Sequence, residues 1–251
     1  MRVAAIYDIH GNLPALEAVL QDIQREAVDL VVVGGDVLPG PMPTETLDRL
    51  EDIGIPARFI QGNGDREVLA VLGGVESTAI PETYRPVMQW VAQQLQPEHV
   101  RRIACWPKSE TVHVTGLGAV LFCHATPRSD TELFTRLTPD HRLMPAFSGV
   151  PARTVICGHT HMQFQRRIGA VHVFNAGSVG MPFGEPGAYW LIVGPTDVQF
   201  RRTSYDFPAA AARIRETRCP QAADFAANNI LSPPSEAQML ELFTRPTRVR
   251  D

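Results

Sequence analysis

Lysine is almost absent from this 251-residue chain, in which Lys108 is the only one. The formal net charge is −4, which gives no general attraction to nucleic acid or to anionic membranes. Arginine doublets at 101–102, 166–167 and 201–202 are scattered along the chain, and we interpret them as solvated surface. The sequence therefore carries no strong signal for a nucleic-acid partner.

Long apolar runs and paired cysteines are also lacking. No segment approaches the roughly 20 apolar residues that span a bilayer. The N-terminal apolar run soon meets charged residues, which indicates a first strand rather than a signal peptide. Cys105, Cys123, Cys157 and Cys219 show no C-x-x-C spacing, and two of them stand inside apolar runs as free thiols usually do. We expect no membrane segment and a cytoplasmic location.

The first quarter of the chain alternates between strand and helix patterns. Apolar runs at 2–7, 29–36 and 56–62 are typical of buried strands, and helical spacing of apolar residues occupies 13–27 and 43–54 between them. This β-α-β-α-β order predicts a sheet with parallel strands covered by helices.

The later pattern changes twice. Residues 67–106 are helical in pieces, residues 127–150 are loop-rich with one short helix, and the chain is again helical from 206. We expect residues 1–205 to form one domain and residues 206–251 to form a helical C-terminal extension packed on it. The surface of this extension leaves homo-oligomerisation open. Short strand patterns separated by turn residues occupy 110–115, 118–125, 153–160, 170–177, 188–194 and 197–206.

A potential metal ligand follows each of five strand patterns. In open α/β sheets, sites assemble outside the carboxyl ends of the strands, so side chains distant in sequence meet there. We therefore expect these side chains to converge. They are Asp8 and His10, Asp36, Asn63, His124, and His159 and His161.

Each of these residues has an ordinary structural interpretation when it is taken alone. Asp8 could cap a helix, Asp36 could be a turn residue, and a single histidine is more often a hydrogen-bonded core residue than a ligand. Together they form a mixed nitrogen and oxygen set suited to first-row divalent metals. Seven ligands are too many for one catalytic metal with an open position. They suit two metals roughly 3.5–4 Å apart that share a carboxylate.

The order of these ligands resembles that of the calcineurin-like metallophosphoesterases, and in particular their small bacterial phosphodiesterase branch. The resemblance covers residues 1–205 and implies a four-layer α/β sandwich of two mixed sheets flanked by helices. The motifs that carry it are D-x-H at 8–10, G-G-D at 34–36, G-N-x-D at 62–65, the lone His124, G-H-T-H at 158–161 and NAGSVG at 175–180.

The resemblance also implies a division of the ligands between two metals, whose identity among Mn, Fe, Zn, Ni and Co stays open. A hydroxide between the metals would attack the phosphorus of a small phosphate ester in line. One metal would take Asp8, His10, Asp36 and His161, and the other Asp36, Asn63, His124 and His159, so that Asp36 bridges. We expect catalysis to involve Asp8, His10, Asp36, Asn63 and His124, which the resemblance implies, and Arg128, which we add from its position after His124.

Gly64 departs from the family pattern, because many members carry at this position a histidine that steers or protonates the substrate. General acid catalysis is worth roughly 10²–10⁴-fold, so unactivated alkoxides should leave slowly. We expect a preference for diesters, cyclic phosphates or aryl phosphates, or a substitute group such as Arg66, Arg128 or a metal-bound water. Arg128 follows His124 closely and could bind a phosphate oxygen. A surface salt bridge is an equal alternative for each arginine.

Three functions stay open on the sequence. The leading one is a two-metal phosphodiesterase, and the second is a phosphomonoesterase that acts on nucleotides or phosphoproteins. The third is a non-catalytic scaffold of the same fold, which should show gaps in the ligand set, and none is visible. Two neighbours of the motifs have supporting roles: we expect Asp65 to orient a ligand and Asn12 to cap the helix after it.

Overall fold

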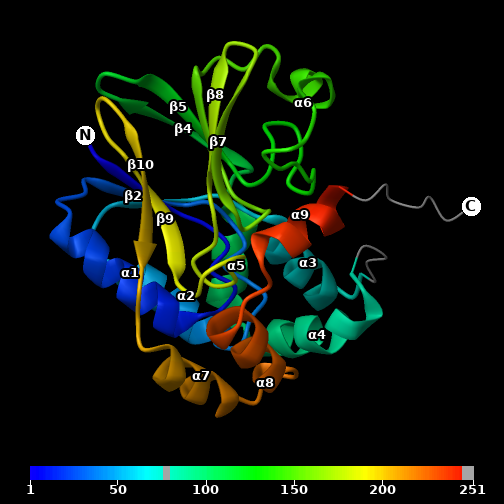
Figure 1. Cartoon of the computed structure of the whole chain (residues 1–251). Coiled ribbons are helices and arrows are strands. Elements are labelled where there is room, and N and C mark those ends of the chain that lie inside the picture. Colours follow the sequence, from blue (N-terminus) through cyan, green and yellow to red (C-terminus); the bar gives the residue numbers. More distant parts are fainter. Residues whose placement is uncertain (76–79, 245–251) are drawn as a thin grey trace, which may run out of the picture.

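The computed structural model describes residues 1–75 and 80–244, which form two five-stranded sheets stacked face to face, with helices outside them (Figure 1). The strand order is β10-β9-β1-β2-β3 in the first sheet and β4-β5-β6-β8-β7 in the second. Both sheets are mixed: β1 pairs with β2 in parallel and with β9 antiparallel, and β6 pairs in parallel with β8, which is antiparallel to β7. The predicted four-layer sandwich is confirmed.

The first sheet and its covering helices follow the predicted β-α-β-α-β order. All four residues of β1 and of β2 are buried, as expected for central strands that are covered on both faces. Helix α1 begins after Asn12, whose side chain accepts a hydrogen bond from the backbone N–H of Ala15 at 3.2 Å, so the predicted cap is confirmed. The elements are β1 (Val3–Ile6), α1 (Leu13–Arg25), β2 (Leu30–Val33), α2 (Pro43–Glu51), β3 (Ala57–Phe59), β9 (Ala188–Val193) and β10 (Val198–Thr203).

The second sheet packs one face against the first sheet and carries α6 (Asp140–Phe147) on the side of its other face. Side chains from both sheets, such as Val32, Phe122 and Leu191, form one buried layer between them. This layer joins the two sheets into one unit. The strands are β4 (Ser109–Val114), β5 (Gly118–Cys123), β6 (Thr154–Cys157), β7 (Gln163–Ile168) and β8 (Val171–Ala176).

Strand β7 is not predicted by the sequence patterns. Of its six residues only Phe164 and Ile168 are buried, and the strand lies at the edge of its sheet. The arginines of the 166–167 doublet stand within it, and Arg166 donates to the carbonyl oxygen of Thr135 at 2.8 Å. A polar edge strand shows little of the apolar alternation that identifies a strand in sequence, which explains the omission.

The C-terminal segment joins the helices that cover the first sheet. Ile214, Ala226 and Ile230 belong to the same buried cluster as Leu16 and Leu20 of α1. The domain boundary at 205/206 stays a prediction, and residues 245–251 of the predicted extension lie outside the described residues. The remaining helices are α3 (Asn63–Leu72), the 3-10 helix η1 (Glu82–Tyr84), α4 (Arg85–Gln94), α5 (Pro97–Cys105), α7 (Phe207–Arg215), α8 (Ala222–Phe225), the π-helix η2 (Ala226–Leu231) and α9 (Glu236–Thr244).

Within the described part of the chain, no helix combines the length and the apolar character that crossing a membrane requires.

Candidate metal centre

The seven predicted ligands meet where β1, β2, β5 and β6 end. Six of them stand in the loops that follow these strands. The seventh, Asn63, is the first residue of α3, with Gly62 as its N-cap. The sheet topology therefore gathers side chains from five separate stretches of sequence at one edge of the sandwich.

The ligand atoms form two groups. In the first, His161 Nε2 lies 3.3 Å from His10 Nε2 and 3.4 Å from Asp8 Oδ1. In the second, His124 Nε2 lies 3.5 Å from Asp36 Oδ2, and His159 offers a ring nitrogen within 4.8 Å of both partners. Each group is compact enough to surround one cation.

One oxygen of Asp36 lies near both groups, as does Asp8 Oδ1, which is 3.4 Å from His161 Nε2 and 3.9 Å from His124 Nε2. Asp36 Oδ2 lies 3.8 Å from His10 Nε2 and 3.5 Å from His124 Nε2. The other oxygen, Oδ1, accepts the backbone N–H of Gly64 at 2.7 Å. The two oxygens of Asp36 thus have separate tasks, because one is held by the start of α3 and the other faces both ligand groups.

The histidine rings are oriented by backbone carbonyl oxygens. The Nδ1 atoms of His10, His124 and His161 lie 3.3, 3.0 and 2.7 Å from the carbonyl oxygens of Pro39, Gly34 and Met181, respectively. Because a carbonyl only accepts, each Nδ1 donates, which leaves each Nε2 as the ring nitrogen available to a cation once it carries no proton. Metal-binding histidines are typically held in this way.

Backbone strain is concentrated at the same place. Among the described residues, seven that are not glycine have a positive φ between 48° and 69°, and five of these are predicted ligands. Such conformations cost on the order of 1–3 kcal/mol each and persist where the surroundings impose them, most often at functional sites. The five are Asp8, His10, Asp36, His159 and His161.

Asp65 holds the loop that carries Asp36. Its buried carboxylate accepts the backbone N–H groups of Asp36, Leu38 and Gly62 at 2.9, 3.0 and 3.0 Å. Burial and the nearby Asp36 carboxylate raise the pKa of Asp65 to about 7. These bonds agree with the orienting role expected for Asp65.

The charges of the ligands are strongly coupled. Burial alone would lower the pKa of His124, but the carboxylates of Asp36 and Asp8 outweigh it and raise this pKa to about 10. Burial favours the protonated form of Asp36, yet His124 and His10 hold the pKa of this carboxyl well below its usual value. Burial and the neighbouring His124 lower the pKa of His159 to about 4. Without cations, His124 therefore carries a proton on each ring nitrogen at neutral pH and is positively charged.

The donor set fits divalent cations. Asp8 Oδ1 and His159 Nε2 are buried without a hydrogen-bond partner among the described residues, an arrangement that is rare in protein interiors. One terminal amide atom of Asn63 lies 3.1 Å from His124 Nε2 and 3.0 Å from His159 Nδ1. An amide nitrogen at this position would donate to both rings, whereas an oxygen there would serve as a cation ligand. Carboxylate, imidazole and amide donors together suit first-row divalent metals.

The structure places Arg128 and Arg66 in surface ion pairs. Arg128 is about half exposed, and its Nε donates to Glu132 Oε2 at 2.8 Å. Arg66 Nε donates to Asp130 Oδ2 at 2.8 Å, and a second nitrogen donates to Glu67. Both arginines thus make the salt bridges that the sequence left as the alternative, and the catalytic role of Arg128 stays a prediction.

The NAGSVG motif at 175–180 contains side chains with a supporting role that the sequence did not predict. Ser178 Oγ donates to the carbonyl oxygen of Asp8 at 2.7 Å and accepts from the backbone N–H of Met181 at 2.8 Å. Asn175 Nδ2 donates to the carbonyl oxygen of Gly158 at 2.6 Å. The motif therefore holds both loops that carry the first ligand group in place. The polar residues Asn175 and Ser178 among small residues are the sequence feature that could have indicated this role.

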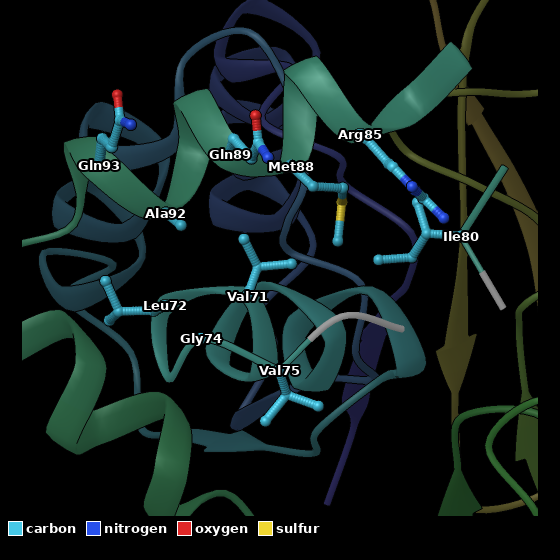
Figure 2. A pocket seen from close by; sticks show the side chains of 10 residues that line it. All are labelled: Val71, Leu72, Gly74, Val75, Ile80, Arg85, Met88, Gln89, Ala92 and Gln93. Atoms are coloured by element: carbon cyan, nitrogen blue, oxygen red, sulfur yellow. The ribbon is translucent and has the colours of Figure 1, made fainter. Parts of the chain in front are cut away.

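A cavity of about 250 Å³, called the site cavity below, opens beside His10, Asp36, His159 and His161. A larger cavity of about 590 Å³ lies between α3 and α4 (Figure 2). Its described lining, which includes Val71, Met88 and Arg85, contains no carboxylate and no imidazole. Of these two cavities, only the site cavity has carboxylates and imidazoles in its described lining.

The fold and the cluster define the class of this protein as a metal-dependent phosphoester hydrolase. Residues 1–195 match the family model of the calcineurin-like phosphoesterase superfamily domain, and the chain belongs to this family.

Relatives of known sequence or structure agree with this class. The chain is 27% identical over 206 residues to the phosphodiesterase YfcE of Escherichia coli, covering 76% of this chain and 87% of that protein. It is 27% identical over 239 residues to the uncharacterized protein MJ0912 of Methanocaldococcus jannaschii, covering 87% and 94%. A metallophosphoesterase structure from Sphaerobacter thermophilus superimposes with a TM-score of 0.71 at 27% identity, covering 90% of this chain and 98% of that one.

Proposed function

We propose that this protein is a phosphodiesterase that works with two divalent cations. The observation that carries the proposal is the position of Asp36 Oδ2, within 3.8 Å of His10 Nε2 and 3.5 Å of His124 Nε2. A carboxylate oxygen close to both ligand groups suits a pair of cations that lie roughly 3.5–4 Å apart. The chain is similar, over 76% of its length, to a protein named as a phosphodiesterase, and this similarity supports the same reaction.

The chain would divide its donors between the two cations. Asp8, His10 and His161 would hold the first, and Asn63, His124 and His159 would hold the second, with Asp36 common to both. When bound, the cations would supply Lewis acidity toward phosphoryl oxygens and lower the pKa of a water molecule. Asp65 would keep Asp36 in position through three backbone N–H groups.

Close packing accounts for the missing histidine at position 64. A Cβ atom on Gly64 would lie 2.4 Å from the carbonyl oxygen of Leu38 and 3.0 Å from the Cδ of Pro39. A side chain here would push the start of α3 away from that loop, and with it the N–H group that holds Asp36 Oδ1. No general acid is therefore supplied from this position, which favours substrates with good leaving groups.

The experiment is a panel of phosphate esters offered to protein loaded in turn with Mn, Fe, Zn, Ni or Co. We expect bis(p-nitrophenyl) phosphate to be hydrolysed with a higher kcat/KM than p-nitrophenyl phosphate. The opposite ranking would support a phosphomonoesterase instead. A scaffold without catalysis would hydrolyse neither ester with any of the metals.

A further inference from the structure

The outer wall of the site cavity comes from the C-terminal extension. Side chains between Cys219 and Asn229 line it together with His10, His159 and His161. These wall residues are about 60 positions or more beyond the last predicted ligand in the sequence. The extension thus takes part in the site.

Buried alanine and isoleucine residues hold this wall in place. Ala222, Ala226 and Ile230 follow one another at intervals of four and pack into the main core, and none is more than 7% exposed. Asp224 and Phe225 stand between them and line the cavity. The segment continues as the π-helix η2, a form of helix that often marks functional sites.

The wall is also tied to the opposite side of the cavity. Gln221 Nε2 donates to the carbonyl oxygen of Thr83 at 2.6 Å, next to the lining residue Tyr84. Gln221 has a φ of 66°, one of the two positive values outside the ligand cluster among the described non-glycine residues. Strain at such a residue indicates that the position of this segment matters.

The lining has a distinct charge character. Among the described residues that line the site cavity, none is Arg or Lys. Arg66 and Arg128 are engaged with carboxylates, and Arg85 lines the cavity between α3 and α4. No guanidinium or ammonium group is therefore available in the lining to bind a second anionic group of a substrate.

The groups that are available suit an apolar or cationic moiety. Tyr84 and Phe225 supply aromatic surface, and Val87 and Met181 supply apolar surface. Asp224 Oδ1 accepts from Asn228 Nδ2 at 2.7 Å, while its Oδ2 accepts no bond from the described residues. Aromatic rings beside a carboxylate attract cationic ligands, and the same carboxylate repels anions.

We propose that the site cavity holds the second alcohol of a phosphodiester and selects it by charge, with Asp224 as the specificity-determining residue. Alcohols that carry an ammonium group are preferred, apolar uncharged alcohols are accepted, and alcohols with a further negative charge are rejected. This inference rests on the proposed phosphodiesterase function.

The test uses three p-nitrophenyl phosphodiesters that differ only in the second alcohol: choline, 3,3-dimethylbutanol and 4-hydroxybutyrate. The first two alcohols have nearly the same shape and differ in charge. For the full, metal-loaded chain we expect kcat/KM to be about tenfold higher for the choline ester than for the dimethylbutyl ester, and about tenfold lower for the hydroxybutyrate ester, since each tenfold step is about 1.4 kcal/mol.

Two variants assign the selectivity to Asp224. In Asp224→Asn the choline to dimethylbutyl ratio should fall toward 1, and Asp224→Glu should restore part of it. Glu216 is exposed, as Asp224 is, but lies outside the cavity lining, so Glu216→Gln removes the same charge and should leave the ratio unchanged. A wild-type ratio of 1, or equal changes in Asp224→Asn and Glu216→Gln, would overturn the proposal.

Binding separates a failure of this inference from a failure of the proposed function. Methylphosphinate analogues of the same three alcohols, in which a CH2 group replaces the ester oxygen, contain no ester bond to hydrolyse, and calorimetric titration of the metal-loaded protein should rank them in the same order. If the diesters are not hydrolysed but the ligands bind in this order, the phosphodiesterase function is wrong and the charge selection stands. If the diesters are hydrolysed and neither kcat/KM nor binding depends on charge, the inference is wrong.

Discussion

The carboxylate of Asp65 accepts the backbone N–H of Asp36 at 2.9 Å. Both residues are buried acids. The hydrogen bond between them uses the backbone N–H of Asp36, so the two carboxyl groups do not share a proton. The remaining bonds of Asp65 go to the N–H groups of Leu38 and Gly62, so one side chain connects the loop after β2 to the start of α3. The position of Asp36, the proposed shared ligand, thus depends on a residue that is outside the predicted ligand set.

Replacing Asp65 with Asn should weaken the centre without removing a ligand. An amide has one acceptor oxygen, so one of the two carboxylate positions would present N–H groups to backbone N–H groups. We expect a loss of about 1–3 kcal/mol in the free energy of unfolding and roughly 10–100-fold weaker metal binding. Denaturant unfolding and metal titration measure these, with the exposed Asp52→Asn as the control. Metal binding as tight as in the wild type would show that Asp65 does not position Asp36.

Metal affinity should rise with pH. The pKa of His124 is raised to about 10 in the cation-free protein, so below pH 10 a cation must displace this proton. His159, with a pKa lowered to about 4, is already neutral in the same range. Raising the pH from 6 to 9 should therefore strengthen apparent binding by about tenfold per pH unit, with about one proton released.

Calorimetric titration in two buffers with different protonation enthalpies counts the released protons directly. Affinity that does not change between pH 6 and 9 would contradict the pairing of His124 with Asp36.

Loss of His124 should remove both metal and activity. We expect His124→Ala to bind fewer metal ions per chain and to lose activity on the order of 10³-fold, since metal catalysis contributes several kcal/mol and each 1.36 kcal/mol is tenfold. Asp36→Ala should behave in the same way. Elemental analysis and diesterase assays measure the two effects. His113→Ala, an exposed histidine on β4, is the matched control, and retention of activity in both Asp36→Ala and His124→Ala would rule out the two-cation assignment.

The nature of the leaving group should dominate the rate. Because Gly64 provides no general acid, diesters with aryl leaving groups should be cleaved roughly 10²–10⁴-fold faster than matched diesters with alkyl leaving groups. A series of substituted phenyl esters gives the dependence of kcat on the leaving-group pKa. Equal rates for aryl and alkyl esters would mean that another residue donates the proton.

The C-terminal extension should be part of the main cooperative unit. Ile230 is 1% exposed and belongs to the core cluster of the first sheet, so Ile230→Ala should lower the free energy of unfolding by about 2–5 kcal/mol in a single transition. Leu242→Ala, at a side chain that is 52% exposed, should have a much smaller effect. Two separate transitions in the Ile230→Ala protein would instead show an independently folding extension.

Local patterns were sufficient for most of the fold. The buried runs that became β1 and β2, and the cap and apolar spacing of α1, are consequences of neighbouring residues alone. Strand β7 was not predicted, because it is a polar strand at the edge of its sheet and its sequence shows almost no apolar alternation. Arg128 is close to a predicted ligand in sequence, but Glu132, four residues further along the same loop, binds its guanidinium.

The sequence by itself predicted which side chains meet at the proposed centre, because each follows a strand pattern and the ends of such strands converge. Only the tertiary structure decided how the donors are used, since this depends on distances between segments remote in sequence. It assigns the two oxygens of Asp36 to different partners. It shows that the backbone of Leu38 leaves no room for a side chain at Gly64. It also brings Asp224 to the site cavity, because the core burial of Ala222, Ala226 and Ile230 holds that segment there.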